Sequence, residues 1–325
     1  MDVIKILEKS VSRELSRQEA IELLEIRNGS HEFYKLIETS NNMSRKEYNN
    51  KAYVFSQIGL NAQPCPMNCK FCSMAESNYT IGTEFRKDMS DIKDICETAK
   101  QLVESGTHDL FLMTTANYSV DEFIKIGTEV SKVLPKNVRL VANIGDFDLH
   151  IAKRLKDAGF TGVYHIRRLG EGKDTDIDPA QRIKTLDAIR DAGLELYYCV
   201  EPIGPEHTYD EILDEMYRAK DYNVDVMAVM RRTPVPGTPL EKNGVITSIE
   251  LTKIAAVTRL VTRPKRSMNV HEVTPMSLLA GINQLYAEIG SNPRDNMENT
   301  ENNRGWGVEK IVELFKDAEW EMSSL

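Results

Sequence analysis

The sequence has no long apolar run and no excess of positive charge, and both absences narrow what the protein can do. No stretch approaches the roughly 18 apolar residues that a membrane-spanning helix needs. The opening residues, MDVIKILEKSVSREL, alternate charged and apolar side chains and lack the apolar region of a signal peptide. Asp and Glu outnumber Lys and Arg by 50 to 41, so no general basic field attracts nucleic acid or an anionic membrane. We therefore expect a cytoplasmic protein without nucleic-acid or membrane partners.

Cysteine is scarce and unevenly spread. The chain has five cysteines, and the first three fall within eight residues. The five are Cys65, Cys69, Cys72, Cys96 and Cys199. An odd number with this spacing is no disulfide framework. In a reducing compartment a tight cluster such as PCPMNCKFC is typical of metal binding or catalysis.

What is present is an ordinary globular composition, with 41% hydrophobic and 28% charged residues among 325. Such a chain can fill a core, which excludes wholesale disorder. The length fits two ordinary domains or one large α/β barrel with an extension.

Short β-rich runs alternate with amphipathic segments from about residue 53 onward, a pattern typical of βα units on a parallel sheet. The predicted strands are residues 53–59, 109–115, 138–145, 162–167, 194–201, 224–231, 267–272 and 283–290. The predicted helices between them include 90–106, 148–159, 179–193, 209–223 and 248–263. The pattern predicts an α/β fold, a TIM-type (β/α)8 barrel over residues 51–325 with a C-terminal lid and helix. Residues 1–50 are predicted to form an N-terminal helical extension, with Ser16 capping one helix.

An open, doubly wound sheet is the rival architecture. It would carry a Gly-rich phosphate-binding turn after its first strand, whereas a cysteine loop occupies that place here. The position puts the loop at the C-terminal mouth of a barrel, where barrel chemistry takes place. Three thiolates suit zinc or an iron–sulfur cluster, and a set of three leaves one metal position open to a substrate or cofactor. Phe71 is predicted to place an apolar ring beside the metal and to restrict water.

The segment CPMNCKFC closely resembles the Cx3CxΦC signature of the radical S-adenosylmethionine (radical SAM) enzymes. The resemblance implies that Cys65, Cys69 and Cys72 hold a [4Fe–4S] cluster. It also implies that SAM chelates the fourth iron, and that an external one-electron reductant of the ferredoxin or flavodoxin type drives SAM cleavage. The product of that cleavage is a 5′-deoxyadenosyl radical that removes a substrate hydrogen.

Two further segments, RIKTLDAIRDAGLEL and RRTPVPGTPLEKNG, resemble the biotin synthase-like branch, which includes hydrogenase-cofactor maturases, methylornithine synthase and archaeal lipoyl synthases. By this resemblance Arg182 binds the SAM carboxylate, which suits a guanidinium fork. Glu171 is expected to contact the ribose or amine of SAM. Glu201 and Ile203 are expected in the segment that flanks its adenine.

The chain departs from biotin synthase itself, which holds a second, [2Fe–2S] cluster on later strands. In the corresponding strands only Cys199 remains, with Leu or Phe, Ala142 and Asn269 at the other expected ligand positions. One thiolate cannot hold such a cluster alone, so biotin synthesis is disfavoured. A lone strand cysteine is commonly a small buried hydrophobe, and the role of Cys199 stays open.

Polar residues at other strand ends are the candidates for substrate contact: Asn117, Tyr118, Asn143, Asp146, His165, Arg167, Arg231, Arg232, His271 and Glu272. Because alternate residues of a strand face inward, only one of each adjacent pair is expected to face the cavity. His271 and Glu272 are predicted to move a proton, and Arg231 or Arg232 and Arg167 to bind a substrate carboxylate or phosphate.

The sequence therefore predicts a radical SAM enzyme acting on a small molecule in cofactor biosynthesis. The tail EIGSNPRDNMENTENNRGWG makes it most similar to an [Fe]-hydrogenase guanylylpyridinol-cofactor maturase. One alternative is a sulfur-insertion enzyme of the lipoyl or biotin synthase type. An alternative from a different class is a non-catalytic iron–sulfur or zinc scaffold.

Overall fold

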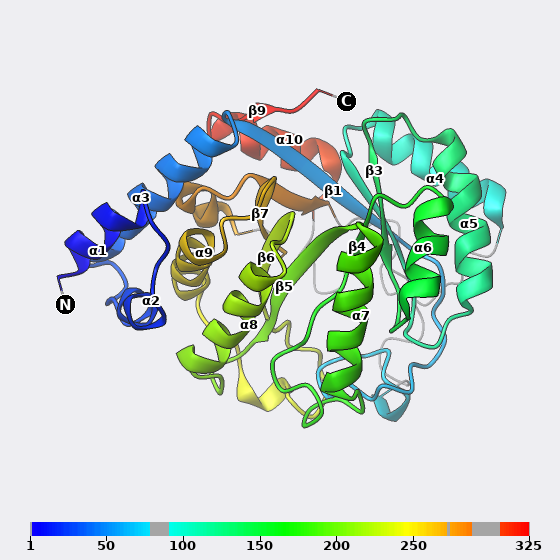
Figure 1. The fold of residues 1–325 in the computed structure, drawn as a ribbon, viewed down its shortest axis with the longest axis horizontal. Coiled ribbons are helices and arrows are strands. Elements are labelled where there is room, and N and C mark those ends of the chain that lie inside the picture. Colours follow the sequence, from blue (N-terminus) through cyan, green and yellow to red (C-terminus); the bar gives the residue numbers. More distant parts are fainter. Residues whose placement is uncertain (1, 79–90, 272–273, 288–305, 325) are drawn as a thin grey trace.

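A closed barrel of eight parallel strands forms the centre of the computed structural model, which describes residues 2–78, 91–271, 274–287 and 306–324 (Figure 1). Strand order runs from β2 to β8 and then to β1, which pairs back with β2 to close the barrel. This confirms the predicted TIM-type (β/α)8 fold. The strands are β1 Lys51–Gly59, β2 Asp109–Met113, β3 Arg139–Asn143, β4 Gly162–Tyr164, β5 Glu195–Ile203, β6 Val226–Arg231, β7 Ser267–Val270 and β8 Gln284–Ala287.

Helices surround the barrel and return the chain to the start of each next strand (Figure 1). They are α4 Ile92–Glu104, α5 Val120–Val133, α6 Leu149–Asp157, α7 Pro179–Ala192, α8 Tyr209–Asp221 and α9 Ser248–Thr262, with α10 Val308–Asp317 near the C-terminus. Helix α7 shows how local sequence sets where a helix begins and ends. Asp178 caps its first turn, Pro179 occupies the first helical position, and Gly193 closes it with a left-handed φ of 65°.

Three helices precede the first strand: α1 Val3–Ser10, α2 Arg17–Leu24 and α3 His31–Glu47. Ser16 caps α2 as predicted, and it forms a capping box with Glu19. The three helices lie against the outside of the barrel next to α8 and α9 (Figure 1). Lys253 of α9, 3% exposed, donates a hydrogen bond to the carbonyl of Ile26 at 3.1 Å. Among the described helices none is long and apolar enough to cross a bilayer.

An aromatic layer fills the barrel interior below the mouth. It consists of Phe55, Phe111, Val141, Tyr197, Val226 and Tyr286, with Tyr164 packed against it. The rings of Phe55 and Tyr286 stack at 4.8 Å between centroids. Because these side chains fill the middle of the barrel, the cavity described below lies towards the carboxyl ends of the strands.

A buried ion pair plugs the opposite end of the barrel. Asp109 is fully buried and pairs with Arg266. The same carboxylate accepts hydrogen bonds from Gln284 at 2.6 Å and from Tyr197 at 3.3 Å. Removing one partner of a buried pair leaves the other charge uncompensated.

We expect Asp109→Ala to lower the free energy of unfolding by about 3–5 kcal/mol, because Arg266 is then buried without its carboxylate. Urea unfolding of the variant measures the change. Glu313→Ala is the matched control, since Glu313 pairs with Lys310 at 3.0 Å while 64% exposed; its effect should stay within about 0.5 kcal/mol. Equal losses in the two variants would contradict the structural importance of the plug.

Candidate active site

A cavity of about 280 Å³ opens at the carboxyl ends of the strands. Its lining combines the cysteine loop that follows β1 with side chains from the ends of several other strands. The lining residues used below are Cys65, Cys69, Phe71, Cys72, Asn143, Tyr164, His165, Arg168, Arg182, Glu201, Met230 and His271. All three clustered cysteines thus share one cavity, at the mouth where the sequence predicts them.

The cysteine loop is compact because its backbone bonds to itself. The N–H of Cys65 donates to the carbonyl of Met74 at 2.8 Å, and the N–H of Glu76 donates back to the carbonyl of Cys65 at 2.9 Å. The N–H of Cys72 donates to the carbonyl of Cys69 at 3.0 Å. These bonds fold the three cysteines into two tight turns whose thiols line the cavity.

The segment after β4 clamps this loop from the side. The N–H of Asp176 donates to the carbonyl of Met67 at 2.7 Å, and the N–H of Lys70 donates to the carbonyl of Asp174 at 2.9 Å. The Lys70 ammonium pairs with the Asp174 carboxylate at 3.2 Å. The cysteines are therefore fixed relative to residues about 100 positions later in the chain.

The electrostatics of the thiols favour metal binding over free thiolates. Burial raises the pKa of Cys69 to about 12, nearby Arg168 opposes the rise, and the neighbouring Cys72 and Cys65 add to it. Three thiolates this close would repel one another, and a cationic metal centre would offset this repulsion and so favour loss of the thiol protons. Within the described ranges, no three His, Cys, Asp or Glu side chains are arranged to hold a single metal ion. As a donor type, the three thiols on the cavity wall suit an iron–sulfur cluster.

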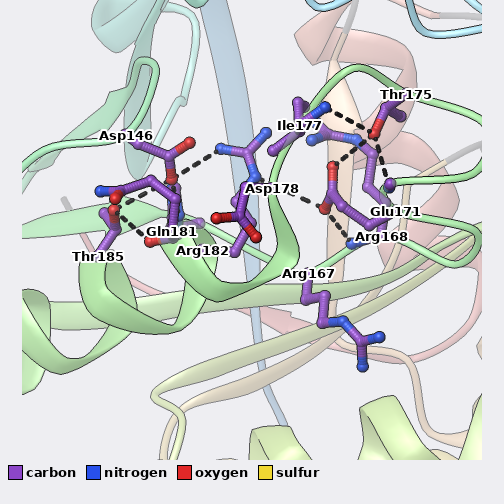
Figure 2. A network of polar contacts seen from close by, with 12 residues as sticks. Asp146, Arg167, Arg168, Glu171, Thr175, Ile177, Asp178, Gln181, Arg182 and Thr185 are labelled. Carbon is purple, nitrogen blue, oxygen red and sulfur yellow. Dashed lines mark hydrogen bonds and ion pairs between the residues drawn. The ribbon is translucent and has the colours of Figure 1, made fainter.

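Beside the thiols, Arg182 lies between two carboxylates (Figure 2). Its guanidinium is 3.2 Å from Asp146 and 3.5 Å from Glu171. Glu171 is itself held by the N–H of Arg168 at 2.7 Å and by the hydroxyl of Thr175 at 3.3 Å. Arg182 is only 5% exposed, and its Nε lies 3.5 Å from Glu171 without hydrogen-bond geometry. A buried guanidinium whose hydrogen bonds are incomplete is suited to a further acceptor, such as the carboxylate of a bound molecule.

Arg168 and Glu201 form a second pair on the cavity wall, with 3.2 Å between the guanidinium Nε and the carboxylate. Burial alone would lower the pKa of Arg168, but Glu201 and Glu171 hold it above its ordinary value. The guanidinium therefore keeps its charge beside the Cys69 thiol. A fixed cation here would stabilise thiolates in the loop.

His165 lies next to Asp146, with 3.1 Å between the ring Nε2 and the carboxylate. Burial lowers the pKa of His165 to about 4 despite this partner. The imidazole is therefore neutral near pH 7 and can donate or accept a hydrogen bond at the cavity wall. Burial would raise the pKa of Asp146, but His165 and Arg182 bring it below its ordinary value.

The structure separates the predicted site residues into two groups. Phe71, Arg182, Glu201 and His271 line the cavity with the three cysteines. Glu171 is buried behind Arg182 and is absent from the described lining. This position favours a role in orienting Arg182 over the direct contact with SAM that the sequence predicts. Glu272 lies outside the described residues.

Two further predicted residues lie off the cavity. Ile203 is fully buried and pairs with Arg231 in the β5–β6 register. The Arg231 guanidinium donates to the carbonyl of Ile246 at 3.0 Å. Inward positions on β6 are Ala228 and Met230, and Met230 lines the cavity. The alternation of the strand therefore turns Arg231 outward.

The guanidiniums of Arg167 and Arg232 are engaged by the protein's own carboxylates. Arg167 lies 3.2 Å from Glu215 and points away from the network of Figure 2. Arg232, 2% exposed, pairs with Glu206. Neither residue belongs to the described cavity lining, so the structure does not bring them to a substrate.

Sequence reasoning missed Arg168, which lines the cavity where Arg167 was expected. The alternation of side chains that begins on β4 could have identified Arg168. Tyr164 faces the barrel interior, so Ile166 and Arg168 continue on the same side, and both line the cavity. β4 ends at Tyr164, three residues earlier than expected, so Arg168 lies in the segment that follows the strand.

The amino-acid sequence is similar to those of known proteins. No protein-family model matches the chain. It is 28% identical over 269 residues to a biotin synthase of Clostridioides difficile, covering 80% of this chain and 81% of that protein. It is 27% identical to a biotin synthase of Acetivibrio thermocellus, with 80% and 82% covered. These relatives support assigning the chain to the radical SAM superfamily, in its biotin synthase-like branch.

Solved structures show the same fold. The [FeFe]-hydrogenase maturase HydG superimposes with a TM-score of 0.80 at 16% identity, over 99% of this chain and 76% of HydG. Methylornithine synthase (PylB) superimposes with a TM-score of 0.80 at 15% identity, over 98% of this chain and 97% of PylB.

Proposed function

We propose that Cys65, Cys69 and Cys72 hold the [4Fe–4S] cluster of this radical SAM enzyme, and that the cavity beside them binds SAM and a small-molecule substrate. The observation that carries the proposal is the convergence of three thiols, the buried Arg182 and the half-buried Arg168 on one cavity at the barrel mouth. When bound, the cluster and SAM would supply a 5′-deoxyadenosyl radical for hydrogen abstraction. A ferredoxin or flavodoxin would supply the electron.

The residues around the cavity divide the binding work between them. Arg182 would bind the SAM carboxylate through a guanidinium nitrogen that contacts neither Glu171 nor Asp146, and these two carboxylates would fix the guanidinium plane for that contact. Glu201, held by Arg168 at 3.2 Å, would accept hydrogen bonds from hydroxyl or amine groups. Phe71 would restrict water beside the cluster. His271 would hold or move a proton of the substrate, with Glu272 beside it in the sequence.

The reaction that these residues support best is carbon–hydrogen activation in cofactor biosynthesis, most like an [Fe]-hydrogenase guanylylpyridinol-cofactor maturase. Supporting this choice, Cys199 is the only thiol on the described inward faces of β2, β3, β5 and β7. The inward positions on β2 and β3 are Phe111 and Val141, both in the aromatic layer, and Ala142 belongs to the outer core. One thiol leaves no visible ligand set for a sulfur-donating cluster.

Iron and sulfide counting after anaerobic reconstitution tests this choice. We expect about four irons and about four sulfides per chain, one cluster only. A larger count that depends on Cys199 would favour the alternative, a sulfur-insertion enzyme like the biotin synthases that the sequence resembles. Colourless protein that retains zinc would favour a scaffold.

Disruption of the gene in its host tests the substrate assignment. We expect [Fe]-hydrogenase protein to accumulate without its guanylylpyridinol cofactor, while growth without added biotin or lipoate continues. A new requirement for biotin or lipoate would contradict the maturase assignment. An oxygen-sensitive cluster and a low-potential reductant also make the cytoplasm the compartment that we propose for the reaction.

A further inference from the structure

A buried amide lies below the cavity floor without any hydrogen bond. Asn269 on β7 is 1% exposed, and neither its side-chain oxygen nor its side-chain nitrogen has a partner. An amide can form several hydrogen bonds, and leaving a buried one unpaired costs about 1–3 kcal/mol per group. A group of this kind in a native structure needs an explanation, and a ligand that completes its hydrogen bonds is one.

The strand geometry aims this amide into the barrel. Met268 and Val270, its neighbours on β7, pack into the outer core around the barrel. Asn269 therefore faces inward, on the same side of the strand as His271, which lines the cavity two residues later. Its register partners are Ala228 on β6 and Gln284 on β8.

The space beside Asn269 is bounded by one small side chain and by one adaptable one. Ala228 separates Asn269 from Cys199 in the register of β5, β6 and β7, so no large side chain stands between them. Met230, the next inward residue of β6, lines the cavity above Ala228. A methionine can rotate aside at low cost, and this movement would open the floor to the amide.

The charges on the wall argue against an anionic substrate group. Arg168 and Arg182 are the only Lys or Arg side chains in the described lining, and both already face carboxylates: Glu201, Asp146 and Glu171. Arg182 is also committed to the SAM carboxylate in the proposed function. At the cavity floor the ring of His271 packs on aromatic side chains, with ring-centroid distances of 5.5 Å to Phe55 and 4.9 Å to Tyr286.

We infer that Asn269 recognises a neutral substrate group with a hydrogen-bond donor beside an acceptor, such as a carboxamide or lactam on a flat ring. Such a group pairs with both free atoms of the amide at once. A carboxylate would satisfy the nitrogen but place an anion against the amide oxygen. This inference rests on the proposed function and adds the substrate class to it.

Nicotinamide and nicotinate test the inference, because they differ only in a carboxamide against a carboxylate. Titration calorimetry with the reconstituted holoenzyme, SAM present and reductant absent, measures both. We expect nicotinamide to bind at least about tenfold more tightly than nicotinate, and Asn269→Leu to weaken nicotinamide by about tenfold. Equal binding of the two probes, no nicotinamide binding, or full binding by the variant would overturn the inference.

Thermal unfolding of the ligand-free proteins separates ligand recognition by Asn269 from a structural role, because a structural role predicts a lower Tm for the variant. Because Leu removes two unpaired polar atoms at similar volume, Asn269→Leu should not lower Tm. A lower Tm would mean that the amide serves the fold, through a buried water for example, and would overturn the inference. The probe comparison in the wild-type holoenzyme stands even if the variant fails to fold. SAM cleavage by the same wild-type preparation tests the proposed function separately from this inference.

Discussion

Cys69→Ala is expected to lose both the cluster and reductive SAM cleavage. Cys69 lies between the other two cysteines, and its thiol lines the cavity with theirs. Without it two thiolates remain, too few to retain the cluster. After anaerobic reconstitution we expect iron to fall from about four per chain to near zero, and 5′-deoxyadenosine to fall below detection. Iron assay and chromatography of the reaction products measure both.

Cys96→Ala is the matched control for this variant. Cys96 is a half-buried cysteine on α4 that packs against the outer core and does not line the cavity. Its loss removes one thiol without touching the proposed ligand set, so iron content and SAM cleavage should remain at the wild-type level. If Cys69→Ala kept its iron, or if the control lost it equally, the assignment of the cluster ligands would be wrong.

Arg182→Met is expected to have the second largest effect, on both stability and SAM binding. The substitution leaves Glu171, whose side chain is fully buried, and Asp146, 19% exposed, without their shared cation. Uncompensated buried charge of this kind costs about 3–5 kcal/mol. The pKa of Asp146, now below its ordinary value, should rise when the guanidinium is removed. Urea unfolding measures the first effect, and equilibrium dialysis with labelled SAM measures the second.

Arg190→Met offers a control on the same helix. Arg190 pairs with Asp187 at 2.9 Å and with Asp191 at 3.0 Å, but its side chain is 56% exposed. Exposed pairs contribute little, so its unfolding free energy should stay near the wild-type value and SAM binding should persist. Normal SAM affinity in refolded Arg182→Met would limit Arg182 to a structural role.

The barrel and the cysteine loop could be predicted from the sequence because both depend on local patterns. Alternating β-rich and amphipathic segments predict the strand and helix order, and the cysteine spacing directly follows a predicted strand. The helix cap at Ser16 and the left-handed helix end at Gly193 were also local signals, and both are present. Helix α5, which is absent from the helices named from sequence, shows the limit of such patterns.

The charge network around Arg182 could not be predicted, because it joins residues whose side chains meet only in the folded barrel. Asp146 follows β3, Glu171 follows β4, and Arg182 belongs to α7. Residue type alone marks each as a possible surface charge. Arg168 lies beyond the end of β4, and Arg167 was named in its place although the alternation from Tyr164 points to Arg168. Unpaired atoms such as those of Asn269 are visible only in three dimensions.

The most direct test of the central claim is electron paramagnetic resonance of the anaerobically reconstituted, dithionite-reduced wild-type protein, recorded with and without SAM. If the three cysteines hold a four-iron cluster with one iron open to SAM, the reduced protein should show a [4Fe–4S]⁺ signal whose g-values change when SAM is added. Absence of a reduced-cluster signal, or a signal that SAM leaves unchanged, would contradict the account.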